Sequence, residues 1–239
     1  MTTRIVKALV LGALLYSSIL PLFAQDDAKP KPKAPEPTVP EVFTLMGQYV
    51  RVAYNNEGFV TLGYRTANTS VGNPWMLLDV GLTVRHGVDT QVMKRDAFSI
   101  QTPDGTTVQL ATQQEYRTGE LRGLQTLANA TRDTISYFPG DVNRRCAVSF
   151  FTDPDKRNMS YDQVELNSQN GCLGRLYFHI PGGIKTGQHW LKVKFAASEV
   201  QVPFRILTKE EAKEFSKTWQ DIKEEHDDAT KAKMKPKPN

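Results

Sequence analysis

The sequence predicts a mainly β fold: an antiparallel sandwich with a short helical insertion and a C-terminal amphipathic helix. Three observations carry this prediction. Between residues 41 and 207, short runs alternate apolar and polar side chains, and clusters of Gly, Pro, Asn and Asp separate the runs. Within that region, residues 112–130 are instead rich in Gln, Glu, Leu and Arg. After Thr208 the apolar spacing changes from two residues to that of a helix.

The first 24 residues have the pattern of an export signal. Arg4 and Lys7 make the start positive, and an apolar run of twelve residues follows over Ala8–Ile19. Leu22-Phe23-Ala24 then supplies a cleavage site. Because a bilayer span needs about 20 apolar residues, we expect cleavage here and no stable membrane insertion of the remaining chain. Retention of the signal as an anchor is the open alternative.

Residues 25–40 are expected to be a linker. Lys29-Pro-Lys-Pro-Lys33 and Pro35-Glu-Pro37 alternate charge with proline, which removes backbone donors and favours an extended polyproline II shape. At about 3.1 Å per residue, Lys29–Pro40 can span roughly 37 Å. The stretch resembles the Lys-Pro and Glu-Pro segments of bacterial periplasm-spanning proteins. A disordered leader after the signal is the equally open alternative.

The first half of the domain predicts two hairpins and one long strand. The expected strands are Tyr49–Tyr54, Val60–Tyr64, Trp75–Arg85, Phe98–Gln101 and Thr106–Leu110. Asn55–Gly58 and Thr102–Gly105 have the composition of the two hairpin turns. In the long strand, the even positions are apolar, whereas Asp79, Gly81 and Thr83 fall on the opposite face.

Residues 112–130 predict one or two short helices, because three leucines recur at helical spacing with breaks near Gly119 and Gly123. Strand signals then return. The expected strands are Ile135–Phe138, Ala147–Thr152, Gln163–Leu166, Gly174–Ile180, Gln188–Phe195 and Val200–Leu207. The clearest hairpin is predicted between Gly174–Ile180 and Gln188–Phe195, through a loop that contains Pro-Gly-Gly.

Two segments resemble immunoglobulin-like domains of bacterial secreted proteins. In Leu176–Leu207, the run Gly187-Gln-His-Trp-Leu-Lys-Val193 is similar to their Gly-x-x-x-Leu-x-Val strand. In Trp75–Thr106, a long apolar strand leads to Phe98-Ser-Ile100 and then to the turn Asp104-Gly105, as in a secreted bacterial domain of unassigned function.

The sequence departs from the second pattern at Arg85-His86-Gly87, where that pattern often carries Asn. The two segments cover less than a third of the chain. The resemblance implies an antiparallel immunoglobulin-like sandwich and carries over no functional residue.

Charge limits the kinds of partner. The formal net charge is +4, and it falls to +2 when Arg4 and Lys7 leave with the signal. No basic and aromatic stripe accompanies this small balance, so nucleic acid is not an expected partner.

Cys146 and Cys172 are the only cysteines. In an exported chain, we expect them to form one disulfide, which stabilises by roughly 3 kcal/mol in the chain-entropy model. Free buried thiols are the main alternative. Two thiolates leave a zinc site half empty, and no Cys-x-x-Cys motif indicates redox chemistry.

No motif commits the chain to a reaction or a cofactor. Gly-x-Ser-x-Gly, Ser-x-x-Lys and His-Glu-x-x-His are all missing from the sequence. Alternation places His179 on the surface and His189 toward the core, on opposite sides of the predicted hairpin, so no metal site is expected there. Asp153 and Asp155 supply too few oxygens for calcium. The charged loop Asp153–Asp162 is either a binding loop or simply solvated.

A C-terminal helix is predicted over residues 208–230, before a basic tail at 231–239. Thr208 and Glu211 form a capping-box pattern at its start. Phe215, Trp219 and Ile222 then make an apolar stripe. The stripe either packs on the domain, since a single helix needs tertiary support, or binds a partner.

We therefore expect a non-enzymatic binding or assembly module of the bacterial cell envelope, periplasmic or secreted. Its partner is an unidentified protein or envelope component. The alternative is a secreted hydrolase or carbohydrate-active domain whose catalytic residues are dispersed along the chain.

Overall fold

The computed structural model describes residues 42–43, 47–152 and 159–234, with the backbone alone for residues 42–43 and 222–234. The expected signal over residues 1–24 and the linker over residues 25–40 lie outside this part of the chain, as does residue 41. Most of the Asp153–Asp162 loop and the last five residues of the tail also lie outside it.

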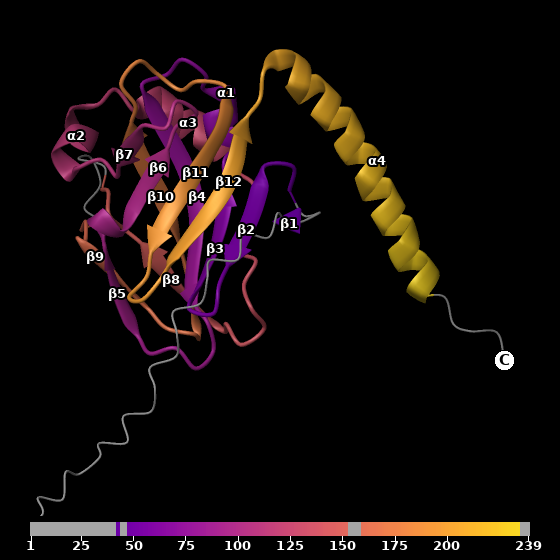
Figure 1. Ribbon diagram of the computed structural model, residues 1–239, viewed down its shortest axis with the longest axis horizontal. Coiled ribbons are helices and arrows are strands. Elements are labelled where there is room, and N and C mark those ends of the chain that lie inside the picture. Colours follow the sequence, from indigo (N-terminus) through magenta and orange to yellow (C-terminus); the bar gives the residue numbers. More distant parts are fainter. Residues whose placement is uncertain (1–41, 44–46, 153–158, 235–239) are drawn as a thin grey trace, which may run out of the picture. The chain divides into compact units, whose positions relative to one another are not determined.

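The larger of two main sheets has the strand order β1-β2-β3-β4-β10-β8 (Figure 1). Its strands are β1 (Val42–Phe43), β2 (Val50–Tyr54), β3 (Gly58–Gly63), β4 (Trp75–Val84), β8 (Arg144–Val148) and β10 (Asn170–His179). Neighbouring strands are antiparallel except β8, which pairs parallel to β10.

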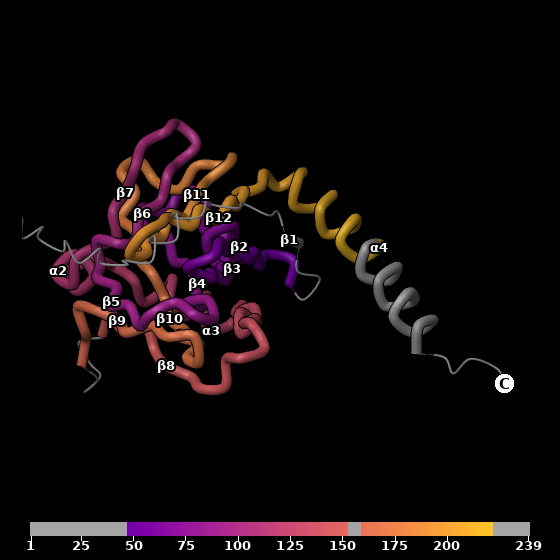
Figure 2. Tube along the Cα trace, turned by 60° about the horizontal axis from the view of Figure 1, so that its bottom comes forward, coloured from indigo at the N-terminus to yellow at the C-terminus, as the bar shows by residue number. Residues whose placement is uncertain are grey.

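The second sheet has the order β12-β11-β6-β7, and a separate two-stranded ribbon joins β5 to β9. The strands are β5 (Gln91–Lys94), β6 (Phe98–Gln101), β7 (Thr107–Gln109), β9 (Gln163–Leu166), β11 (Gly187–Lys194) and β12 (Glu199–Ile206). Figure 2 shows β6, β7, β11 and β12 on one side of the fold, with β8, β10 and α3 on the other.

Helices are α1 (Arg65–Thr69), α2 (Gln113–Thr118), α3 (Arg122–Ala130) and α4 (Lys209–Met234). A capping box starts α2, because the Thr112 hydroxyl accepts from the Glu115 amide and the Glu115 carboxylate accepts from the Thr112 amide. The same arrangement between Thr208 and Glu211 starts α4, as the sequence predicted. This last helix continues to Met234, beyond the predicted end at residue 230.

All ten residues of β4 are buried, which the alternation alone did not indicate. Its even positions join one continuous core together with β10 and the second sheet. Its odd positions face the other way, where Trp75 and Leu77 pack with Tyr177 against α2 and α3 in a second, smaller core. The larger sheet is therefore covered on both faces along this strand, and we call the side that carries the odd positions its outer face.

The predicted hairpin between Gly174–Ile180 and Gln188–Phe195 is wrong. These segments belong to β10 and β11, which lie in different sheets. The chain between them bonds elsewhere, because the Ile180 amide donates to the Pro74 carbonyl and the Ile184 amide to the Asn73 carbonyl. A connection of this length leaves the pairing partner open, unlike a two-residue turn.

The expectation of a wholly antiparallel fold is also wrong for one pair of strands. The strand expected over Ala147–Thr152 is β8, which begins earlier, at Arg144, and runs parallel to β10 with Cys146 directly opposite Cys172. The two cysteines form the expected disulfide.

Ile135–Phe138 was predicted as a strand, but it is irregular. Ile135 is nonetheless buried, and the Tyr137 carbonyl accepts from the Thr61 hydroxyl. Gly81 allows the segment to lie this close, since a Cβ there would stand 3.0 Å from the Ile135 carbonyl oxygen. Apolar content here reflects burial against the outer face of the sheet and not strand pairing.

The Asn55–Gly58 turn is tied to the turn between β11 and β12 by a buried carboxylate. Glu57 accepts hydrogen bonds from the Ala197 amide at 3.0 Å, the Gln91 side chain at 2.7 Å and the Ser198 hydroxyl. Asn55 accepts from the Gly58 amide and donates to the same Ser198 hydroxyl. These bonds connect the two main sheets and the β5–β9 ribbon at one point.

We predict that Glu57→Ala lowers the free energy of unfolding by about 1–3 kcal/mol, because it removes the acceptor of the buried Gln91 side chain and of the Ala197 and Ser198 donors. Urea denaturation measures this change. Glu165→Ala, at an exposed glutamate on β9, is the matched control and should change stability little. An equal loss of stability in the two variants would contradict a stabilising role for the Glu57 hydrogen bonds.

Candidate functional site

A cavity of about 270 Å³ lies beside the outer face of the larger sheet. Its wall is contributed by α2, α3, β8, β10 and the segment that follows β8. The lining residues are Tyr116, Gln125, Asn129, Val148, Ser149, Phe151, Thr152, Met159, Arg175 and Tyr177. We call this space the α3–β10 cavity. Amide, hydroxyl and aromatic groups converge on it, and its accessible lining is more polar than apolar. A ligand here is therefore recognised mainly by hydrogen bonds to these polar groups.

Three aromatic rings form one side of the cavity. The centroids of Tyr116, Phe151 and Tyr177 lie 4.9–5.1 Å from one another, with edge-on or tilted geometry. The Gln125 amide donates to the Tyr116 hydroxyl at 2.7 Å. This packing fixes the rings, so the cavity has a rigid aromatic side.

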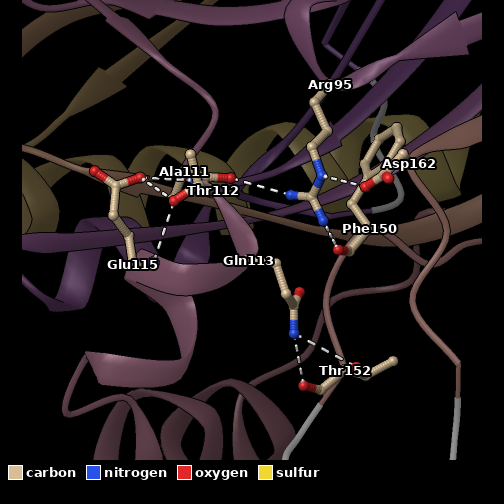
Figure 3. Close-up of polar contacts among 8 residues, drawn as sticks. All are labelled: Arg95, Ala111, Thr112, Gln113, Glu115, Phe150, Thr152 and Asp162. Atoms are coloured by element: carbon tan, nitrogen blue, oxygen red, sulfur yellow. Dashed lines mark hydrogen bonds and ion pairs between the residues drawn. The ribbon is translucent and has the colours of Figure 1, made fainter.

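Arg95 holds the wall of the cavity in place (Figure 3). Its guanidinium donates to the carbonyl oxygens of Ala111 and Phe150 and to the Asp162 carboxylate. It also lies 4.7 Å from the centroid of the Phe151 ring. One side chain therefore connects the segments before α2, after β8 and before β9.

A second contact in Figure 3 joins α2 to the same wall, because the side-chain amide of Gln113 donates to the Thr152 carbonyl at 3.2 Å. The capping box between Thr112 and Glu115 lies beside it and fixes the start of the helix. The wall is therefore held from both sides by bonds to backbone groups.

Arg175 is the only charged residue that lines the α3–β10 cavity among the described residues. It stands directly opposite Asp79 in the β4–β10 register, and its Nε donates to the Asp79 carboxylate at 3.2 Å. Arg132 lies 3.8 Å from the same carboxylate oxygen. Burial raises the pKa of Asp79, while the charge of Arg175 opposes that rise.

A second cavity, of about 550 Å³, lies at the end of the outer face near Trp75. It is lined by Asn73, Pro74, Trp75, Glu115, Thr118, Gly119, Glu120 and His179. Hydrogen bonds from the amide and hydroxyl of Thr112 lower the pKa of Glu115, so this carboxylate acts as an ionised helix cap.

The apolar stripe of α4, predicted to pack on the domain or to bind a partner, is partly in contact with the domain. Phe215 packs against the main core, and its ring centroid lies 6.1 Å from that of Tyr49. Trp219 is buried, with 9% of its surface exposed. The side chain of Ile222 lies outside the described residues, as do Asp153 and Asp155. The first turns of α4 therefore contact the domain itself.

His179 and His189 lie in different sheets, so the predicted hairpin between their strands does not exist. His179 is exposed and His189 is fully buried, as the alternation predicted. His189 donates from Nδ1 to the Gly187 carbonyl at 3.0 Å and stacks on Phe204. Across the described ranges, no three His, Cys, Asp or Glu side chains have the placement of a metal site.

Sequence reasoning missed Arg175 and Arg95 as site residues. The sequence did contain one indication of Arg175, because Asp79 is the only charged residue in the ten-residue apolar strand β4. A buried carboxylate needs hydrogen bonds or a cation, which indicates an arginine or lysine on a neighbouring strand. The position of that cation required the strand pairing, which the sequence does not show.

Family models, curated proteins and solved structures give no match to this chain. Within residues 42–43, 47–152 and 159–234, no helix has the length and apolar content needed to cross a membrane.

We predict that His189 makes the protein sensitive to mild acid. Burial lowers its pKa below the ordinary value, and its buried Nε2 has no hydrogen-bond partner in the described chain. The unfolded state therefore binds the proton more tightly. The free energy of unfolding should therefore have its full value above about pH 6.5, the ordinary pKa of histidine, and should fall as the pH drops below that value.

Urea denaturation of the wild type and His189→Phe, at about pH 7.5 and about pH 5.5, tests this prediction. The loss of stability at the lower pH should be smaller in the variant. His86→Gln, at an exposed histidine, is the control and should retain the wild-type dependence. An identical pH dependence in His189→Phe would exclude His189 as the cause.

Proposed function

We propose that this chain is a non-enzymatic binding or assembly module of the bacterial cell envelope, built on an immunoglobulin-like sandwich. The observation that carries the proposal is the α3–β10 cavity, in which rigid aromatic rings and hydrogen-bonding groups surround an arginine anchored by Asp79. Such a site suits recognition of a ligand. The two sheets that share one core support the sandwich assignment, from which the parallel strand β8 is a departure.

Export is the second part of the proposal. The pattern of residues 1–24 supports it, and the Cys146–Cys172 disulfide is typical of proteins in an oxidising compartment. We place the working protein in the periplasm or outside the cell, where it meets an envelope component or another exported protein. No nucleic acid partner is proposed.

We predict that the chain expressed in a bacterium is recovered outside the cytoplasm, starting at Gln25. Without reductant, its mass should be two hydrogens below that of the dithiol form, because of the disulfide. Cell fractionation followed by intact-mass spectrometry measures both features. A cytoplasmic chain that retains Met1 and two free thiols would contradict the proposal.

The alternative of a secreted hydrolase or carbohydrate-active domain has one observation in its favour. The cavity near Trp75 is lined by two carboxylates and a histidine, the groups used for general acid–base chemistry. The pKa of Glu115 is lowered, however, so it is poorly suited to donate a proton at neutral pH. Glu120 and His179 remain as the groups available for such a reaction.

We expect no product when the protein is incubated with soluble polysaccharides and chromogenic esters, because the binding proposal assigns no reaction to this cavity. Product release is measured by reducing-sugar and absorbance assays. Glu120→Gln and the exposed control Glu165→Ala are assayed in parallel. Turnover that survives in the control and disappears in Glu120→Gln would establish the hydrolase instead.

A further inference from the structure

Arg175 lines the α3–β10 cavity, and its guanidinium is only partly used in hydrogen bonds within the protein. Only its Nε is bonded, to the buried Asp79 carboxylate, and the terminal amino groups have no hydrogen-bond partner among the described residues. The side chain is 22% exposed and lines the cavity. A guanidinium held through Nε keeps its two terminal nitrogens available for a planar, two-oxygen acceptor.

The local charge balance favours an anion. Two guanidinium groups, of Arg175 and Arg132, approach the single carboxylate of Asp79. The neighbouring carboxylate, of Asp133, is already paired with Arg65 at 2.9 Å. One positive charge is therefore left over in this cluster, and none of the described lining residues of the cavity is acidic.

The size and lining limit the rest of the ligand. About 270 Å³ is just below the range of about 300–1,000 Å³ that is usual for ligand cavities, which suits a single sugar or a single amino acid rather than a chain. Ser149, Thr152 and Asn129 bring hydroxyl and amide groups to the lining. These groups can bond to the hydroxyl or amide groups of such a ligand.

We propose that the α3–β10 cavity binds a small carboxylate, of single-sugar or single-amino-acid size, through the terminal amino groups of Arg175. Asp79 acts as the positioning residue, since it holds Nε and so orients the guanidinium toward the cavity. This inference rests on the proposed binding function and names the ligand class for its site.

The test titrates the ¹⁵N-labelled full mature chain, with its disulfide intact, with glucuronate, N-acetylalanine and glucose. We expect a carboxylate to shift the NMR signals of Arg175 Nε–H and of the Ser149 and Thr152 amides, whereas glucose should not. Whichever carboxylate binds more tightly identifies the source of the group. Arg175→Gln should weaken its binding by about tenfold or more, because charge-assisted bonds are lost.

Arg145→Gln is the matched control, because it removes the same charge from an exposed position on β8. Its dissociation constant should stay near that of the wild type. Arg175→Gln also removes a partner of Asp79, so Asn129→Trp provides a second variant that obstructs the cavity from an exposed position and keeps the ion pair. It should weaken carboxylate binding as well.

Four results would overturn the carboxylate assignment: no shift with any probe, equal binding of glucose and glucuronate, unchanged binding in Arg175→Gln and Asn129→Trp, or equal weakening in Arg145→Gln. Equal binding of glucose at this cavity would still support a binding module. Turnover of any probe would instead overturn the proposed function.

Discussion

The central strand β4 has no face in contact with water, and this constraint shapes the structure around it. Its even positions lie in the main core and its odd positions are also buried, so each polar group on the odd positions must find a partner within the protein. The Thr83 hydroxyl donates to the Asn167 carbonyl, and the Asp79 carboxylate forms ion pairs with Arg175 and Arg132. Gly81 has no side chain to satisfy, and the irregular segment at Ile135 lies over it.

The same constraint explains why a guanidinium has a fixed direction at the cavity. Burying the Asp79 carboxylate costs free energy that paired cations offset, and removing one partner of such a pair costs more than the pair contributes. Because Arg175 is directly opposite Asp79 on β10, its Nε donates to the carboxylate, and the same side chain lines the cavity. A requirement of folding therefore produces an oriented donor at a candidate binding site.

Alternation in the sequence was enough to find most strands, and turn chemistry was enough to find the Asn55–Gly58 hairpin, because both are local. Pairing between distant strands is not local. The placement of β10 and β11 in different sheets, and the parallel pairing of β8 with β10, depend on contacts between strands that are far apart in the sequence. Ile135 shows the same limit, since an apolar run signals burial without saying what covers it. The α3–β10 cavity is formed by elements that are far apart in the sequence. The sequence therefore indicated the buried charge of Asp79 but not that Arg175 lies opposite it.

The disulfide connects the proposed compartment to the proposed site. Cys146 and Cys172 face each other in the parallel pair, and their Cα atoms are 4.3 Å apart. The bond therefore holds β8 against β10 at the edge of the sheet, where a strand has a neighbour on one side only. The residues that follow β8, from Ser149 to Thr152, form the wall of the cavity and are held by Arg95 and Gln113. An oxidising environment, which the proposed export would provide, thus supports the position of this wall through the register of β8.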